Sequence, residues 1–127
     1  RGICCLRAGV PDETENIHII SIVGRYLEHS RIYIFGQGER ARYYIGSADW
    51  MTRSTLRRVE IAAPVTAPAL KARLQHIFDT MLADNCNARV QQPDGSYVRR
   101  MPGADAVDCQ AQFYEEAYQA NVHSSLK

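Results

Sequence analysis

The alternation of apolar and polar positions along the chain predicts several short strands. Aromatic and β-branched runs at residues 31–35 and 42–45 are separated by Gly-Gln-Gly-Glu, which predicts a β-hairpin. The runs at residues 87–90 and 96–100 flank a Pro-Asp-Gly turn and predict a second, smaller hairpin. Residues 3–7 and 57–65 are also predicted strands, and residues 17–23 are predicted to form a strand or a short buried element.

A spacing of three and four positions between apolar residues predicts two helices. The first covers residues 67–84, and the second covers residues 105–120. The apolar face of the first consists of Leu70, Leu74, Ile77, Phe78, Met81 and Leu82. The sequence contains neither an internal repeat nor a linker-like segment, and we therefore expect residues 1–127 to form a single domain.

The composition is that of a folded globular domain. The chain has 127 residues, of which 46% are hydrophobic and 23% charged, and no apolar run approaches the roughly 20 residues of a membrane span. This length excludes a large self-contained enzyme. Because a strand-like run follows Arg1 at once, we expect the chain to be a fragment of a longer cytoplasmic protein.

The charge is balanced overall but uneven along the chain. The net charge is +1, and 13 of the 15 basic residues are arginine. Residues 25–58 contain seven arginines and only three acidic residues. The arginine side chain presents a fork of donors that fits phosphate and carboxylate oxygens, so this segment suggests an anion site. The alternative, that these arginines are solvated and pair with neighbouring acids, stays open.

The four cysteines lie at positions 4, 5, 86 and 109. Their spacing fits neither a zinc site nor a redox motif. We expect all four to be reduced thiols in or near the core, as is usual in the cytosol.

The candidate chemistry is concentrated between residues 29 and 60. His29 and Arg31 are two positions apart, so in a strand their side chains project to the same side. Ser47 follows a predicted strand in a Gly-Ser turn, where backbone amides and a hydroxyl can meet an anion. Arg58 and Glu60 follow. A histidine with nearby cations suits phosphoryl transfer, although a lone histidine is more often structural.

These residues resemble half of the phospholipase D superfamily motif, His-x-Lys followed by Gly-Ser-x-Asn. In this sequence the corresponding residues are His29-x-Arg31 and Gly46-Ser47-Ala48-Asp49. Arginine stands where the motif has lysine, and aspartate stands where it has asparagine.

Longer runs are similar to the bacterial polyphosphate kinase family, in its second C-terminal, phospholipase D-like domain. They are Arg-Gly-Ile-Cys-Cys-Leu-Arg at residues 1–7, Ser-Ile-Val-Gly-Arg-Tyr-Leu-Glu-His-Ser-Arg at 21–31 and Tyr-Ile-Gly-Ser-Ala-Asp-Trp-Met at 44–51. The resemblance implies an α/β fold class, with a mixed β-sheet flanked by helices.

The resemblance also implies an activity. Enzymes of this family reversibly transfer the terminal phosphate of ATP to polyphosphate with Mg²⁺, through a phosphohistidine that would lie outside this chain. The implied partners are ATP or ADP, polyphosphate, the rest of the parent chain and further copies of the enzyme, but no nucleic acid. The implied location is cytoplasmic, or peripheral at the inner membrane. The sequence offers no carboxylate cage, so we expect the phosphates to hold the Mg²⁺.

Individual roles follow from the same resemblance. His29 matches a histidine that moves a proton to or from the reacting groups, and Arg1 matches an arginine that contacts nucleotide phosphates. Arg58 and Glu60 match further polar positions, with Glu60 expected to orient an imidazole or Arg58. Arg31 and Ser47 are assigned to phosphate binding by the superfamily motif alone.

Two other hypotheses remain open. The chain could be a phospholipase D-like phosphodiesterase or nuclease that completes its site by forming a homodimer, or a non-catalytic module that binds anions. On the kinase hypothesis the isolated fragment is expected to be inactive, because it lacks the nucleophile.

Overall fold

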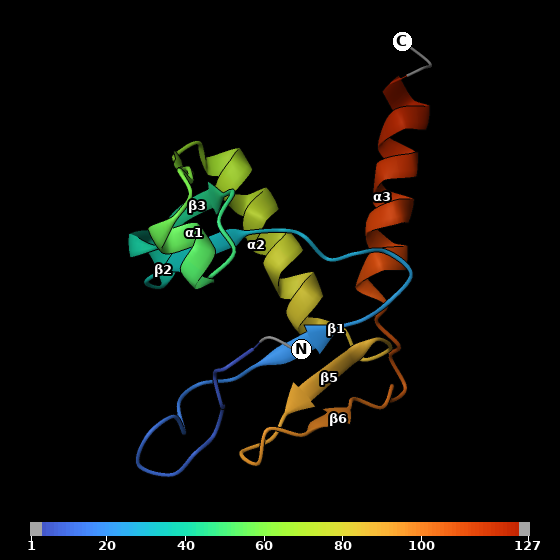
Figure 1. Ribbon diagram of the computed structural model, residues 1–127. Coiled ribbons are helices and arrows are strands. Elements are labelled where there is room, and N and C mark those ends of the chain that lie inside the picture. The colour runs from blue at the N-terminus through green and yellow to red at the C-terminus, as the bar shows by residue number, and fades with distance from the viewer. Residues whose placement is uncertain (1–3, 125–127) are drawn as a thin grey trace. The chain divides into compact units, whose positions relative to one another are not determined.

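The computed structural model describes residues 4–124 (Figure 1). The chain divides into two compact units: residues 29–79 form one, and the described residues before and after them form the other. Helix α2 begins in the first of these units and ends in the second. The single-domain organisation stays a prediction.

Residues 29–79 contain a three-stranded antiparallel sheet in the order β2-β3-β4. The strands are Ile32–Phe35, Arg42–Gly46 and Ala62–Val65. In the β2–β3 loop, the short helix η1 (Gly38–Arg40) follows Gly36, whose φ of 84° favours glycine. Helix α1 (Thr52–Leu56) lies between β3 and β4. Pro64 pairs with Tyr44 from the edge strand β4, where proline is tolerated.

The two faces of this sheet differ because side chains alternate along each strand. One face meets α2 (Pro68–Ala83), where the Tyr43 hydroxyl donates a hydrogen bond of 2.6 Å to Gln75 Oε1. The Lys71 ammonium lies 5.9 Å from the centre of the same tyrosine ring. The opposite face carries the aromatic side chains Tyr33, Phe35 and Tyr44.

The other unit contains a second antiparallel sheet, in the order β1-β5-β6 (Figure 1). Its strands are Ile20–Ile22, Ala88–Gln91 and Tyr97–Arg99. Asp94 closes the turn between β5 and β6 by accepting a hydrogen bond of 2.8 Å from the Ser96 amide. Helix α3 (Cys109–Ser124) follows the sheet.

Both predicted hairpins and the helix predicted at residues 67–84 are confirmed. The second predicted helix starts later than residue 105, at Cys109, because the Asp108 carboxylate caps it. Asp108 Oδ1 accepts hydrogen bonds of 3.0 Å from the amides of Gln110 and Ala111. The expectation of one mixed sheet was wrong in detail: within residues 4–124 the strands form two sheets, both antiparallel.

The strand predicted at residues 3–7 is wrong for the part that the structure describes. Residues 4–7 are exposed and adopt no regular structure. A side-chain amide pairs with this segment in place of a neighbouring strand: Gln91 Oε1 accepts from the Ala8 amide at 2.9 Å, and Gln91 Nε2 donates to the Leu6 carbonyl at 3.0 Å. Cys4 and Cys5 are therefore exposed and outside the core, contrary to expectation.

Two other predicted strands are shorter than expected. The run at residues 17–23 forms a strand only over Ile20–Ile22. The run at residues 57–65 forms a strand only over Ala62–Val65, and Val59 within it is 98% exposed.

Candidate functional site

His29 and Arg31 lie against each other, as their spacing predicted. Arg31 Nη2 is 2.7 Å from His29 Nε2, and Arg31 Nη1 is 3.5 Å from Nδ1. Arginine can only donate hydrogen bonds, so Nε2 is the acceptor in the closer contact when it carries no proton. His29 is exposed, so a substrate can reach its ring.

Asp49 holds the other side of the same guanidinium. Its Oδ1 accepts hydrogen bonds from Arg31 Nε at 3.0 Å and from Nη2 at 2.8 Å. Its Oδ2 lies 3.5 Å from Arg53 Nη2. The hydrogen bonds from Arg31 outweigh the opposing effect of burial and lower the pKa of Asp49 below its ordinary value of 3.8. Asp49 is therefore ionised at neutral pH.

Ser47 and Glu60 form a second pair beside this cluster. The Ser47 hydroxyl donates a hydrogen bond of 2.5 Å to Glu60 Oε2 and accepts one of 3.0 Å from the Ile61 amide. The Ser47 amide in turn donates to the Ile61 carbonyl at 3.0 Å. These bonds fasten the turn after β3 to the segment before β4.

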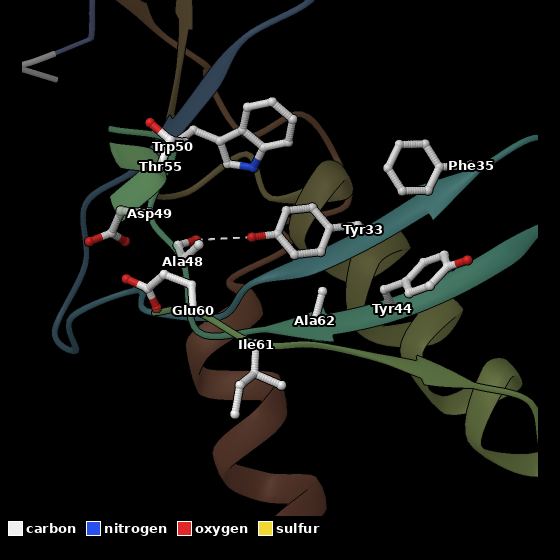
Figure 2. Close-up of a pocket in the computed structure, with 10 residues that line it drawn as sticks. All are labelled: Tyr33, Phe35, Tyr44, Ala48, Asp49, Trp50, Thr55, Glu60, Ile61 and Ala62. Atoms are coloured by element: carbon white, nitrogen blue, oxygen red, sulfur yellow. Dashed lines mark hydrogen bonds between the residues drawn. The ribbon is translucent and has the colours of Figure 1, made fainter. Parts of the chain in front are cut away.

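The turn that carries Ser47 and Asp49 depends on a close approach between Gly46 and Tyr33. A Cβ atom on Gly46 would lie 2.7 Å from Tyr33 Cε2, so only glycine fits without displacing the ring. The Tyr33 hydroxyl donates a hydrogen bond of 2.9 Å to the Ala48 carbonyl, drawn as a dashed line in Figure 2. The aromatic ring therefore sets the path of the turn.

A pocket of about 390 Å³ lies over the aromatic face of the sheet (Figure 2). The rings of Tyr33 and Trp50 have centroids 6.1 Å apart, and those of Phe35 and Tyr44 are 5.9 Å apart in an edge-on arrangement. The carboxylates of Asp49 and Glu60 lie at one end of the pocket (Figure 2). The pocket thus joins an apolar floor to the polar cluster.

The structure brings together four of the predicted site residues, in two pairs: His29 with Arg31, and Ser47 with Glu60. Glu60 was expected to orient an imidazole or Arg58, and that role stays a prediction. In the structure Glu60 Oε2 accepts a hydrogen bond from the Ser47 hydroxyl. Arg58 is exposed, and no ion pair or hydrogen bond involves its side chain within residues 4–124. Arg1 lies outside the described residues.

Sequence reasoning missed the contribution of three residues to this region: Asp49, Arg53 and Trp50. Asp49 was noted only as a departure from the phospholipase D motif. The sequence did contain a sign of this role: the two residues that differ from the motif, Arg31 and Asp49, carry opposite charges and could therefore form an ion pair.

Two further properties of the described residues bear on function. Within residues 4–124, no group of three His, Cys, Asp or Glu side chains is placed to hold a metal ion. In the same part of the chain, no helix is both long and apolar enough to cross a membrane.

Fold and site together define an α/β domain with a compact cluster of histidine, arginine and carboxylate side chains. Residues 1–112 match the family model described as polyphosphate kinase C-terminal domain 2. The chain is 56% identical over 104 residues to a polyphosphate kinase of Synechocystis sp. and 48% identical over 120 residues to one of Bacillus anthracis. The chain therefore belongs to the polyphosphate kinase family.

These alignments cover 82% and 94% of this chain but only 14% and 17% of the relatives. The chain thus spans about a sixth of their length. The crystal structure of polyphosphate kinase from Porphyromonas gingivalis aligns with 94% of this chain and 18% of its own, with a TM-score of 0.85 and 34% identity. The predicted α/β, phospholipase D-like fold class is confirmed.

Proposed function

We propose that this chain supplies part of the active site of a polyphosphate kinase, an enzyme that reversibly transfers the terminal phosphate of ATP to inorganic polyphosphate. The phosphohistidine intermediate would form on a residue outside the chain, and a homo-oligomeric, cytoplasmic parent enzyme is part of the same proposal. The observation that carries it is the contact between His29 and Arg31, which lies within the residues that match the family model.

The geometry suits proton transfer beside a phosphate. A phosphate oxygen that displaced the contact between His29 Nε2 and Arg31 would meet the imidazole and the guanidinium together. There the imidazole would take a proton from an attacking group or give one to a departing oxygen. Arg31 lies within hydrogen-bond distance of that nitrogen, so its cationic group can stabilise a phosphate oxygen bound at the same place.

Other residues of the site would bind phosphate. Ser47 would turn its hydroxyl hydrogen bond from Glu60 to a phosphate oxygen, and Arg58 has an exposed guanidinium that a polyanion can reach. Glu60 would hold Ser47 in place. Arg1 is proposed for nucleotide phosphates on the family resemblance alone. Mg²⁺ is the proposed cofactor and would reach the site on the phosphates, because it binds few protein ligands when phosphates are present.

The experiment follows ATP formation from ADP and polyphosphate with Mg²⁺ by the full-length parent enzyme. His29→Ala should lower the rate by about 100-fold or more, which is the usual contribution of a general acid or base. His18→Ala is a matched control, because His18 is also exposed and lies outside the cluster.

The outcomes separate the hypotheses. An unchanged rate in His29→Ala would make His29 structural, and an inactive parent enzyme would refute the kinase proposal. Hydrolysis of a phosphodiester by this chain alone, rising with its concentration, would favour the homodimeric phosphodiesterase. Anion binding that is indifferent to His29→Ala would favour a non-catalytic module.

A further inference from the structure

The side chains at positions 31 and 49 form an ion pair, and these are the two positions at which the sequence departs from the phospholipase D motif. The side chain of Arg31 is 18% exposed and that of Asp49 is 35% exposed. Within residues 4–124, the polar contacts of the Arg31 guanidinium are with two residues, His29 and Asp49. The guanidinium therefore bridges an imidazole and a carboxylate.

We propose that Asp49 is a positioning residue of the phosphate site: it holds the guanidinium of Arg31 against His29, so that the two residues act as one unit. This inference rests on the proposed function, in which His29 and Arg31 meet the phosphate. It adds a residue that touches neither phosphate nor nucleotide and acts through Arg31.

Stability alone does not account for this pair. Asp49 is accessible to water, and accessible ion pairs contribute little to the free energy of unfolding because solvent screens them. An unrestrained arginine side chain samples many rotamers. The two hydrogen bonds to one carboxylate oxygen limit Arg31 to the orientation in which Nη2 meets the imidazole. The effect of Asp49 should therefore be found in catalysis.

A purely electrostatic role and a positioning role of Asp49 predict opposite effects of removing its carboxylate on catalysis, which makes the inference testable. Asp49 is ionised, since hydrogen bonds from Arg31 lower its pKa. If the carboxylate acted only through its charge, it would repel phosphate, and removing it would lower KM for polyphosphate. If Asp49 positions Arg31, removing it releases the guanidinium and lowers kcat/KM.

The test is a double-mutant cycle in the full-length parent enzyme, measured as ATP formation from ADP and polyphosphate. Asp49→Ala should lower kcat/KM by about 10- to 100-fold, the usual cost of a misplaced group at a reacting centre. Arg31→Ala and the double variant should be about equally impaired, because residues that act as a unit do not give additive losses. Asp49→Asn keeps one acceptor oxygen and should fall between Asp49→Ala and the parent.

Asp79→Ala is the matched control. Asp79 is an exposed aspartate of the same unit whose Oδ1 accepts a hydrogen bond of 2.8 Å from Gln75, and it belongs to no part of the proposed site. Its substitution should leave kcat/KM unchanged. A thermal melt of each variant shows whether it is folded, and Asp49→Asn carries the test if Asp49→Ala does not fold.

Three results would overturn the inference. They are a rate of Asp49→Ala equal to that of the parent, a lower KM for polyphosphate in that variant, and independent, multiplying losses in the double variant. If His29→Ala and Arg31→Ala also kept full activity, the proposed function would fail as well. Loss of activity in those two variants but not in Asp49→Ala would refute the positioning role alone.

Discussion

At the scale of single residues, the most constrained carboxylate outside the site is Asp84. It is fully buried and follows the C-terminal end of α2. Its Oδ1 accepts hydrogen bonds from the amides of Asn87 at 2.7 Å and Ala88 at 2.9 Å, and its Oδ2 accepts one from Cys109 at 3.0 Å. One side chain thus connects the end of α2, the start of β5 and the start of α3.

The ionisation of Asp84 should make stability depend on pH. Burial opposes ionisation, but the backbone donors of Cys109, Asn87 and Ala88 outweigh it and lower the pKa below the ordinary value of 3.8. The folded state therefore binds the proton less readily than the unfolded state. This contribution to stability is complete above about pH 4 and is lost as the pH falls through the lowered pKa.

Thermal melts between pH 2 and pH 7 test this assignment. Asp84→Asn should destabilise the chain by about 1–3 kcal/mol at pH 7, because its amide group turns a donor toward buried N–H groups. The difference from the parent should shrink as the pH falls below about 4, because Asp84 then binds a proton in the unfolded chain before it does so in the folded chain. Asp79→Asn, at an exposed position, is the control. A difference that stays constant down to pH 2 would contradict the role of Asp84.

Cys109 should be the least reactive thiol of the four. It is buried, and burial together with the neighbouring Asp84 carboxylate raises its pKa from 9.0 to about 12. Only the thiolate reacts with alkylating reagents, so Cys109 should resist modification at pH 8 while Cys4 and Cys5, which are exposed, are modified first. Mass mapping after brief treatment with iodoacetamide measures this order. Early labelling of Cys109 in the folded chain would contradict its burial.

At the scale of elements, the sequence predicted correctly those features that depend on residues close together in the chain. The hairpin at residues 31–45 and the helix at 67–84 follow from periodicity and turn residues, and so does the contact between His29 and Arg31. Ser47 and Glu60 are separated in the chain by a helix and a loop, so no local sequence pattern predicts their hydrogen bond. The strand predicted at residues 3–7 failed because its neighbour is a glutamine side chain from a distant strand.

A second glutamine acts in the same way. Gln110, near the start of α3, accepts a hydrogen bond of 2.9 Å from the Tyr26 amide and donates one of 2.8 Å to the Tyr26 carbonyl. Its Nε2 also donates to Glu28 at 2.7 Å. The segment that leads to His29 is thereby fixed without a neighbouring strand. Gly24 leaves the space that the amide needs, because a Cβ there would lie 2.5 Å from Gln110 Oε1.

Replacing Gln110 should therefore destabilise the chain. Gln110→Ala leaves both backbone groups of Tyr26 without this partner, and we expect a loss of about 1–3 kcal/mol in the free energy of unfolding. Gln112→Ala is the matched control on the same helix, since its side-chain amide donates a hydrogen bond to the exposed Glu116 and not to backbone groups of another segment. Urea unfolding measures both. Equal stability of the two variants would show that the Gln110 amide is not needed.

At the scale of the whole molecule, the aromatic face of the β2-β3-β4 sheet exposes several large apolar side chains to water. Trp50 is 84% exposed and Phe35 is 58% exposed, and both line one pocket with Tyr33 and Ile61 (Figure 2). Single apolar residues are common on protein surfaces, but several side by side mark a surface that binds other apolar groups. The chain should therefore bind an apolar dye in its folded state.

The fluorescence of anilinonaphthalene sulfonate measures this binding. Trp50→Ala should lower the dye signal of the folded chain, because the indole forms one wall of the pocket against Tyr33. Met101→Ala is the control: Met101 is 79% exposed, belongs to the other unit and is not among the residues that line the pocket. If both substitutions lowered the signal equally, or if neither did, the dye would not report on this face. A selective loss in Trp50→Ala would identify the aromatic pocket as the principal apolar binding surface of residues 29–79.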